Sequence, residues 1–470
     1  MAGRTQEWQE DVTYIYIPDS EVERRLVRKI DQRIVPTVWV LYTLSYLDRA
    51  NIANAKVGGM EEALQLTSTQ YSVILLLFFV SYVLFEVPAN MTLTRVRPSI
   101  FLSALCVLWG GVAACLAACK SWQALAGVRF ALGVVEAGFA PGVAFYLSSW
   151  YKRHELAKRY SIYYTATAVS GAFSGLLAGI ITDKLRFARG IQGWQWLLLI
   201  EGGGSCLAAC FTWFILPDWP STTKWLTLEE RLIAVHRLAH DGIGNTQAGD
   251  TPSHSESLKM ALRDWRTYYL AVMYMLATGS QTIQYFIPTL VGQLGYTGYR
   301  KQYMTIPIYT IALMFILVFC FTSDIRRERG NYVTLAALVA SVSFIVTAAV
   351  NDDHIKYAFL CLAVGGVYAA CPLTLLWVFG AIDHPAEKRA VAIAFVNGLG
   401  NSASIYGSFL WPAKTGPRYV QGFATTTAFV LTLAIMAQIF KRLLEKYPSK
   451  GLNDDVPIDN LDKGSVNASV

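Results

Sequence analysis

Four charged side chains stand within apolar segments that are long enough to cross a lipid bilayer. Asp48 and Arg49 lie in the first such segment, and Arg129 and Glu136 lie in the fourth. A charge at this depth is costly, so it usually faces a protein interior or a water-filled path and takes part in function. Buried carboxylates can take up and release protons, and arginines bind anions, so these residues indicate ion-coupled transport.

Arg49 is the predicted anion-binding residue. Its guanidinium group stays charged and matches a carboxylate with two parallel hydrogen bonds, whereas a lysine would be a looser point charge. The alternative is a purely structural ion pair with Asp48 or with another acidic residue.

Asp48 and Glu136 are the predicted proton carriers. Burial and a neighbouring arginine shift the pKa of a carboxyl group in opposite directions, and this competition can place its titration near the working pH. Arg129, Gly133 and Glu136 share one helical face, so we expect Arg129 to pair with Glu136 and to change its partner when the proton arrives. The alternative is that the two acids only neutralise Arg49 and Arg129.

Two further charged positions are predicted to act as gates. Glu86 lies far from Arg49 and nearer to the predicted cytosolic side, which favours a gating or helix-end contact over substrate binding. Asp324 and Arg327 belong to the charged loop between the eighth and ninth apolar segments, a tight turn that can latch neighbouring helix ends. A basic loop without a specific role is the alternative.

The elements that position these residues are predicted to be membrane-spanning helices. Of the 470 residues, 54% are hydrophobic and only 16% are charged, less charge than a soluble chain of this length needs. Apolar runs of about 18–25 residues, each able to cross a bilayer, recur along the whole chain. Twelve spans are predicted, at about 34–55, 70–91, 99–119, 123–149, 158–182, 194–216, 267–291, 303–322, 331–350, 355–381, 389–412 and 420–441.

Both termini are predicted to lie in the cytosol. With this orientation most of the 40 Lys and Arg residues fall in cytosolic loops, as the positive-inside rule requires. The net charge of +7 is therefore attributed to a cytosolic surface that faces the lipid bilayer, and no nucleic-acid partner is expected.

Five parts follow one another along the chain. They are a cytosolic N-terminal segment 1–33, an N-terminal six-helix bundle 34–216, a cytosolic linker 217–266, a C-terminal six-helix bundle 267–441 and a cytosolic tail 442–470. Within the linker, Thr227 and Glu230 have the spacing of a capping box, which predicts a short helix that ends near His240.

Catalysis with a metal or an organic cofactor is not expected. The 8 cysteines lie within apolar segments and form no CxxC cluster, which is typical of small buried hydrophobes. No nucleophile motif or phosphate-binding loop appears, so we expect a protein that is not an enzyme and that uses a proton gradient in place of a cofactor. None of the 6 histidines lies deep in a predicted span, so proton coupling must rest on carboxylates.

Several motifs resemble the major facilitator superfamily, and more closely its anion:cation symporter family, the fungal allantoate, nicotinate and pantothenate permease type. The matching stretches cover nearly the whole chain, and those of the first half are the more specific. They are Tyr46–Ala55, Phe78–Tyr82, Glu86–Asn90, Arg129–Gly142, Trp150–Arg159, Leu216–Asp218, Leu226–Arg231, Glu387–Ala390 and Asn397–Asn401.

The resemblance implies an all-α membrane protein of 12 transmembrane helices in two six-helix bundles, with cytosolic N- and C-termini and a plasma-membrane location. It implies alternating access around a central cavity lined by helices one and four. In the sugar-acid symporters of the wider group, the arginine that matches Arg49 holds the substrate carboxylate, and protonation is assigned to the positions of Asp48 and Glu136. The vesicular branch carries a histidine in helix two, which this chain lacks.

The resemblance also implies a set of weaker substrate-binding candidates. Tyr46 and Tyr82 match tyrosines near the sugar-acid site. Amides and aromatic side chains in the second half can orient a polar substrate, although helix packing explains them equally well. These second-half candidates are Gln281, Gln284, Trp377 and Asn397.

The predicted function is proton-coupled symport of a small organic anion, a carboxylate or vitamin-like molecule. One alternative is export of a secondary metabolite by proton antiport. The fifth span is rich in glycine (Gly171, Gly175 and Gly179) but lacks the proline-containing motif usual in drug antiporters, which favours import. A second alternative is a non-transporting nutrient receptor. The identity of the anion stays open.

Overall fold

The structure is a computed structural model in which every regular element of the described chain is a helix. It describes residues 17–18, 20–93, 96–185, 187–240, 254–382 and 386–447. Parts of the two predicted terminal segments and of the predicted linker, namely 1–16, 19, 241–253 and 448–470, therefore lie outside the described residues.

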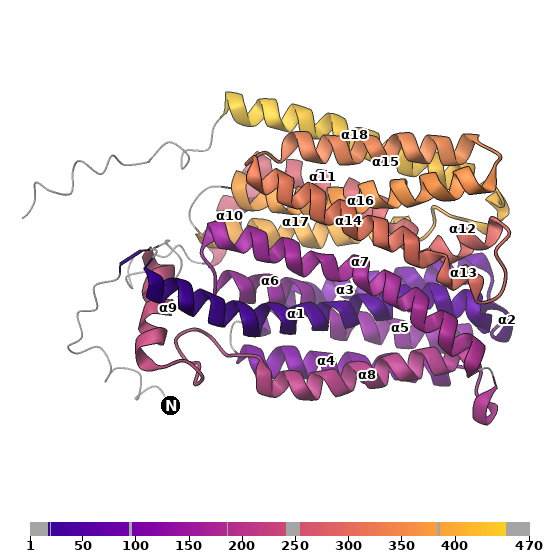
Figure 1. Cartoon of the computed structure of the whole chain (residues 1–470), viewed down its shortest axis with the longest axis horizontal. Coiled ribbons are helices and arrows are strands. Elements are labelled where there is room, and N and C mark those ends of the chain that lie inside the picture. Colours follow the sequence, from indigo (N-terminus) through magenta and orange to yellow (C-terminus); the bar gives the residue numbers. More distant parts are fainter. Residues whose placement is uncertain are drawn as a thin grey trace, which may run out of the picture.

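The long helices run side by side in two groups that follow the sequence (Figure 1). The first group is drawn in indigo to magenta, and the second in orange to yellow. The first half contains α1 (Glu21–Ala55), α2 (Glu61–Ala63), α3 (Ser68–Leu93), α4 (Pro98–Cys115), α5 (Trp122–Glu136), α6 (Phe139–Ser148), α7 (Arg153–Lys184) and α8 (Gly193–Ile215). The second half contains α11 (Trp265–Gln281), α12 (Ile287–Gln293), α13 (Arg300–Tyr303), α14 (Thr305–Ile325), α15 (Gly330–Ala349), α16 (Asp353–Ala381), α17 (Ala386–Gly407) and α18 (Val420–Lys446).

Nine helical segments of the described chain are long and apolar enough to cross a membrane. They are Ser68–Glu86, Pro98–Ala118, Trp122–Ser148, Lys158–Lys184, Gly193–Ile215, Arg300–Ile325, Gly330–Ala349, Asp353–Ala381 and Val420–Lys446. The other three predicted spans coincide with α1, α11 followed by α12, and α17. The α11 helix ends early because Pro288 opens α12 and cannot continue a helix that precedes it. The count of twelve spans stays a prediction.

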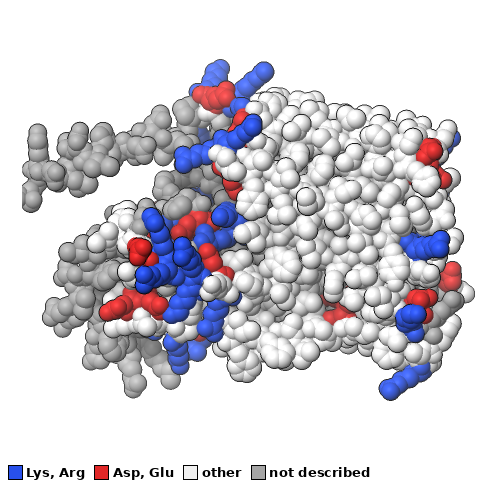
Figure 2. All heavy atoms as spheres, viewed as in Figure 1, with Lys and Arg blue, Asp and Glu red and all other residues white. Residues whose placement is uncertain are grey.

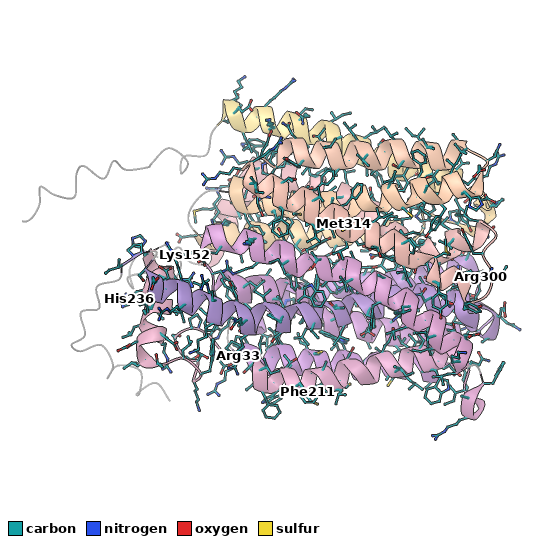
Figure 3. The ribbon with its side chains drawn as sticks, viewed as in Figure 1. Arg33, Lys152, Phe211, His236, Arg300 and Met314 are labelled. Carbon is teal, nitrogen blue, oxygen red and sulfur yellow. The ribbon has the colours of Figure 1, made fainter. Side chains whose placement is uncertain are left out.

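Both ends of the described chain lie at the same end of the bundle, where α1 begins and α18 ends (Figure 1). We call this the terminal end, and the opposite end, which holds α2 and α13, the loop end. Charged side chains gather at these two ends and most densely at the terminal end, while the broad middle of the face shown has very few of them (Figure 2). The helical segments that cross this middle band are apolar. Phe211 and Met314 are exposed in this apolar band (Figure 3), as expected where lipid surrounds the protein.

The linker helix α9 (Leu228–His240) is fixed to the first half at the terminal end, the end marked by Lys152 and His236 in Figure 3. Arg237 is 0% exposed and lies between two glutamates: its Nε is 3.2 Å from Glu23, and its Nη2 donates to Glu155. Lys152 also pairs with Glu23, at 2.6 Å. These buried pairs hold the start of α1, the start of α7 and the linker together.

The predicted capping box at the start of α9 is confirmed. The backbone N–H of Glu230 donates to Thr227 Oγ1 at 3.2 Å, and the N–H of Thr227 donates to Glu230 Oε2 at 3.0 Å. Burial acts to raise the pKa of Glu230, but hydrogen bonds from the Lys29 ammonium and from Thr227 lower this pKa below its ordinary value. The Lys29 contact therefore adds a link between α1 and the linker helix.

Candidate functional site

An ion pair between α1 and α5 forms the centre of the candidate site. Arg49 Nε donates to Glu136 Oε1 at 2.8 Å, and Ser45 donates a second hydrogen bond to the same oxygen. Arg49 is 5% exposed and Glu136 is 1% exposed. Because the pair is closed off from the surface, each charge depends on the other for compensation.

Aromatic rings surround the guanidinium group of Arg49. Its carbon Cζ lies 4.8 Å from the ring centre of Tyr82, 5.1 Å from that of Tyr46 and 5.4 Å from that of Phe78. Such cation–π contacts hold a cation in an apolar setting and orient it. Among the described residues Glu136 is the one acid that accepts a hydrogen bond from Arg49, through Nε, and Tyr82 also interacts with the guanidinium group.

The predicted pair of Arg129 with Glu136 does not form in this structure, and neither does the alternative pair of Asp48 with Arg49. Arg129 does not bind Glu136, because seven residues of helix separate their backbones by about 10 Å. Asp48 does not bind Arg49, because consecutive residues of a helix point in directions about 100° apart and do not face each other. The structure instead pairs Glu136 with Arg49 across two helices.

Asp48 and Arg129 form the other part of a buried group of charges. Both are buried, and Asp48 interacts electrostatically with Glu136, Arg129 and Arg49. In the described chain, Asp48 Oδ2 and the Nε and Nη2 of Arg129 have no hydrogen-bond partner. We call Asp48, Arg49, Arg129 and Glu136 the charge cluster.

Close packing of α5 against α3 sets the position of this cluster. A Cβ atom at Gly133 would lie 2.1 Å from Ser81 Oγ and 2.3 Å from the carbonyl oxygen of Phe78. Only glycine fits at this contact, which lies between Arg129 and Glu136 along α5. The lack of a side chain at Gly133 therefore serves a helix–helix contact.

Two glutamines of the second half accept hydrogen bonds from buried tyrosines. Tyr164 of α7 donates to Gln281 Oε1 at 3.2 Å, and Tyr368 of α16 donates to Gln284 Oε1 at 2.8 Å. Tyr285 follows directly and interacts electrostatically with Arg49. These three tyrosines were not among the predicted site residues. In the sequence they are marked only by a phenol group within an apolar span.

The other predicted substrate contacts of the second half have different surroundings. Asn397 of α17 donates from Nδ2 to Glu86 Oε1 of α3 at 2.9 Å, which joins the two halves. Trp377 packs on Phe440 of α18, with ring centres 5.0 Å apart, and beside Gly330 of α15. The contacts of Trp377 are thus inside the second half, and they explain this residue by helix packing.

The charged turn that contains Asp324 and Arg327 contacts a neighbouring helix end, but through other residues than these two. Asp324 binds Arg329, and Glu328 of the same turn binds Lys441 of α18. Arg327 is exposed and has a left-handed backbone conformation, with φ of 49°. The basic partner of Asp324 is therefore Arg329, and no ion pair is seen for Arg327 in the described chain.

Contacts between the halves close the cluster at the loop end. Gly171, Gly175 and Gly179 line one face of α7 at four-residue spacing, and each touches α13 or α14, at Tyr309, Thr305 and Tyr303 respectively. We call this row of contacts the loop-end door. Tyr71 of α3 adds a hydrogen bond to the carbonyl oxygen of Tyr285, at 3.1 Å.

Different contacts close the cluster toward the terminal end. They are the hydrogen bond between Asn397 and Glu86 and the ring contact between Tyr160 of α7 and Phe379 of α16, with centres 5.7 Å apart. We call this pair of contacts the terminal-end door. The structure thus shows a state in which Arg49 is closed off on both sides.

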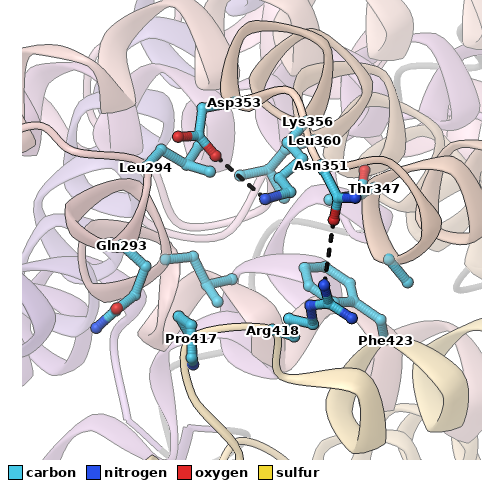
Figure 4. Close-up of a pocket in the computed structure, with 12 residues that line it drawn as sticks. Gln293, Leu294, Thr347, Asn351, Asp353, Lys356, Leu360, Pro417, Arg418 and Phe423 are labelled. Carbon is cyan, nitrogen blue, oxygen red and sulfur yellow. Dashed lines mark hydrogen bonds and ion pairs between the residues drawn. The ribbon is translucent and has the colours of Figure 1, made fainter.

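A separate cavity of about 280 Å³ lies at the loop end of the second half (Figure 4). Lys356 and Asp353 pair across it at 3.1 Å, and Arg418 binds Asn351 at 3.3 Å. These polar groups are exposed and partnered, so the cavity offers no buried charge for a ligand. In the described chain, no group of three or more His, Cys, Asp or Glu residues could hold a metal ion.

Comparison with known proteins relates this arrangement to one family. The profile described as Major Facilitator Superfamily matches residues 38–408. The "MFS transporter prlL" of Fungal sp. (strain NRRL 50135) is 33% identical over 426 residues, which are 88% of this chain and 85% of that protein. The "MFS-type transporter efuF" of Hormonema carpetanum is 32% identical over 421 residues, 87% of this chain and 83% of that protein.

A solved structure shows the same fold at low sequence identity. It is a bacterial homologue of the human lysosomal transporter Spinster, described as inward-facing and occupied. The TM-score is 0.65 at 15% identity, and the match covers 91% of this chain and 98% of that chain.

Proposed function

The chain belongs to the Major Facilitator Superfamily, and we propose that it is a secondary active transporter that carries a small organic anion together with protons by alternating access. Its membership makes it a multi-pass membrane transporter. We further propose that the substrate is an anion, that its transport is coupled to protons, and that the chain belongs to the anion:cation symporter family. In this proposal the chain crosses the plasma membrane twelve times and both termini lie in the cytosol.

The observation that carries the proposal is the buried ion pair between Arg49 and Glu136. A substrate carboxylate can bind Arg49 only by competing with Glu136, since both need the same guanidinium group. A proton on Glu136 removes its charge and releases Arg49 for the anion. One anion and one proton together leave the buried charge unchanged, which avoids the cost of an unpaired charge.

The surrounding residues have supporting roles in this proposal. Tyr46 and Tyr82 hold the guanidinium group and line the place where an anion would lie. The amides of Gln281 and Gln284 approach from the second half and can orient a polar substrate. Asp48, as a second proton carrier, lies in the field of Arg129.

The same residues support antiport if the carrier crosses with either the anion or the proton bound, but not with both. Export of a secondary metabolite is therefore the second candidate. The related proteins are named as transporters without a direction, so their names are compatible with export as well as import. Transport itself is favoured over a nutrient receptor by the same names.

Uptake into proteoliposomes tests the proposal. Labelled nicotinate, pantothenate, allantoate and sugar acids are offered with a proton gradient imposed and then collapsed. We expect at least one carboxylate to accumulate only with the gradient and to move with the proton. Movement of the anion against the proton would identify the exporter, and an anion that accumulates after the gradient has collapsed would refute proton coupling.

The Glu136→Gln variant tests the role of this residue. Glutamine resembles the protonated glutamate, so the variant should still exchange labelled for unlabelled anion but should lose gradient-driven accumulation. Glu62→Gln is the matched control, because Glu62 is exposed at the loop end. Full accumulation in Glu136→Gln would contradict the proposed coupling.

A further inference from the structure

Glu201 of α8 is a buried acid that the proposed function does not use. It is 2% exposed, and neither carboxylate oxygen has a hydrogen-bond partner among the described residues. Natural proteins rarely leave a buried polar atom without a partner, and an ionised carboxylate least of all. Helix packing alone does not explain why an acid occupies this position.

The position of Glu201 is tightly defined by the packing of α8 on α4. A Cβ atom at the next residue, Gly202, would lie 2.5 Å from the carbonyl oxygen of Gly110 and 2.6 Å from the backbone nitrogen of Ala114. The two helix backbones touch here, so α8 cannot rotate to bring Glu201 to the surface. One turn further along α8, Ser205 Oγ is also buried without a partner in the described chain.

The charge cluster lies within electrostatic reach of Glu201. Among the described residues, Asp48 of α1 and Arg129 of α5 are the charged groups that act on it. Cys106 of α4 and Cys206 of α8 also lie within electrostatic reach of Asp48. Glu201 therefore extends the cluster to a third helix.

Even without Glu86, which accepts a hydrogen bond from Asn397, a count of the charge cluster and Glu201 shows that at least one acid must be neutral. Asp48, Glu136 and Glu201 are three carboxyl groups, and Arg49 and Arg129 are two guanidinium groups. Glu136 binds Arg49 directly, which leaves two acids for Arg129. An uncompensated carboxylate in an apolar interior takes up a proton in preference to remaining charged.

Glu201 is the acid that fits the neutral form. Asp48 lies in the field of two arginines and one acid, Glu136, whereas Glu201 lies in the field of one arginine, Arg129, and one acid, Asp48. Both oxygens of Glu201 lack a donor, and for Asp48 this holds for Oδ2. The charged form is therefore stabilised more at Asp48 than at Glu201.

We propose that Glu201 holds a proton in the closed state and passes it to Asp48 during the transport cycle. The proton leaves the Glu201 carboxyl group and binds the Asp48 carboxylate, so the total charge does not change. This inference rests on the proposed function for the transfer to Asp48, but the protonation of Glu201 in the closed state does not depend on it.

Infrared difference spectroscopy of the purified full-length protein tests the protonation directly. The carbonyl band of a protonated carboxylic acid should be present at neutral pH in the wild type, lost in Glu201→Gln and retained in the exposed control Glu62→Gln. Loss of a carboxylate band in Glu201→Gln, with the acid band unchanged, would overturn the proposal. If Glu201→Gln does not fold, Glu201→Asp should keep an acid band at a shifted frequency, and the absence of any shift would overturn it instead.

Transport measurements test the transfer. Glu201→Gln should retain anion exchange and lose gradient-driven accumulation, and Glu201→Asp should recover part of it. Unchanged accumulation with an unchanged pH profile in Glu201→Gln would refute the transfer. A sodium gradient that drives uptake in place of protons would also refute it. A wild type that moves anions without protons would refute the proposed function, while the infrared band would still report on Glu201.

Discussion

The loop-end door predicts a specific effect of adding one methyl group at Gly175. A Cβ atom there would lie 2.1 Å from Thr305 Oγ1 and 2.7 Å from the carbonyl oxygen of Gln302. The hydroxyl group of Thr305 can rotate away, but the backbone carbonyl cannot. It must retreat from 2.7 Å to the 3.4 Å at which ordinary contact begins, a shift of about 0.7 Å that moves α7 and α14 apart.

This shift should disfavour the closed loop-end door. Overpacking of a well-packed contact typically costs about 1–3 kcal/mol. The gain in helix propensity from glycine to alanine stabilises α7 equally in both states and cancels. A penalty of this size lowers the ratio of closed to open molecules by roughly 5- to 150-fold.

A native cysteine reports this change. Cys371 of α16 is fully buried beside Tyr164, between the two halves, so a water-soluble maleimide should label it slowly in the wild type. In the purified Gly175→Ala variant, labelling of the Cys371 peptide, followed by mass spectrometry, should accelerate by a factor in the same range. Transport should slow, because each cycle requires this door to close.

A glycine on the outer surface provides the control. A Cβ atom at Gly203 of α8 would meet nothing within 4 Å, so Gly203→Ala should label and transport like the wild type. Equal labelling of Cys371 in Gly175→Ala and the wild type would refute the reasoning about the door. Equal acceleration in both variants would show that the effect does not come from the contact at Thr305.

Three further substitutions test other parts of the molecule. Arg237→Ala removes the fully buried cation from Glu155 and leaves Glu23 with Lys152, so it should lower the free energy of unfolding by about 3–5 kcal/mol in chemical denaturation. The exposed control Arg25→Ala should change it by less than about 0.5 kcal/mol. Asn397→Ala removes the 2.9 Å hydrogen bond to Glu86, which is worth about 1.5–3 kcal/mol for a charged acceptor. The terminal-end door should therefore open more often, and maleimide labelling of Cys371 should accelerate. An unchanged labelling rate would show that this bond does not hold the door closed. Arg49→Lys loses the paired donors and should weaken anion binding about ten-fold or more in calorimetry, and retained affinity would place the anion elsewhere.

The helical fold was predictable because its main signal is local. Apolar runs of membrane length mark nine of the twelve predicted spans in the described chain. The capping box at Thr227 and Glu230 marks the start of the linker helix, again through neighbouring residues. The break after α11 was missed, since the Pro288 signal lies inside an otherwise continuous apolar stretch.

The partners within the site were not predictable because they depend on how the helices are rotated against each other. The sequence places Asp48 beside Arg49, yet the helix turns the two side chains toward different neighbours. Glu136 reaches Arg49 from 87 residues away. Glu201 lies in the sixth predicted span, far along the chain from the other charges, and no local motif connects it with them. Its electrostatic reach to Asp48 appears only in the folded chain.

In the proposed cycle, the Arg49–Glu136 pair also explains why the anion and the proton travel together. The closed state leaves Arg49 5% exposed and Glu136 1% exposed, so closure removes both groups from water. With an anion alone, two negative groups would face one guanidinium group. With a proton alone, Arg49 would be buried without a counter-charge. Either state costs several kcal/mol to close, whereas the empty and the fully loaded states are neutral and close readily. A carrier that closes only when it is empty or fully loaded is a symporter, and Glu136→Gln removes the neutral empty state, which is why it should exchange anions but not accumulate them.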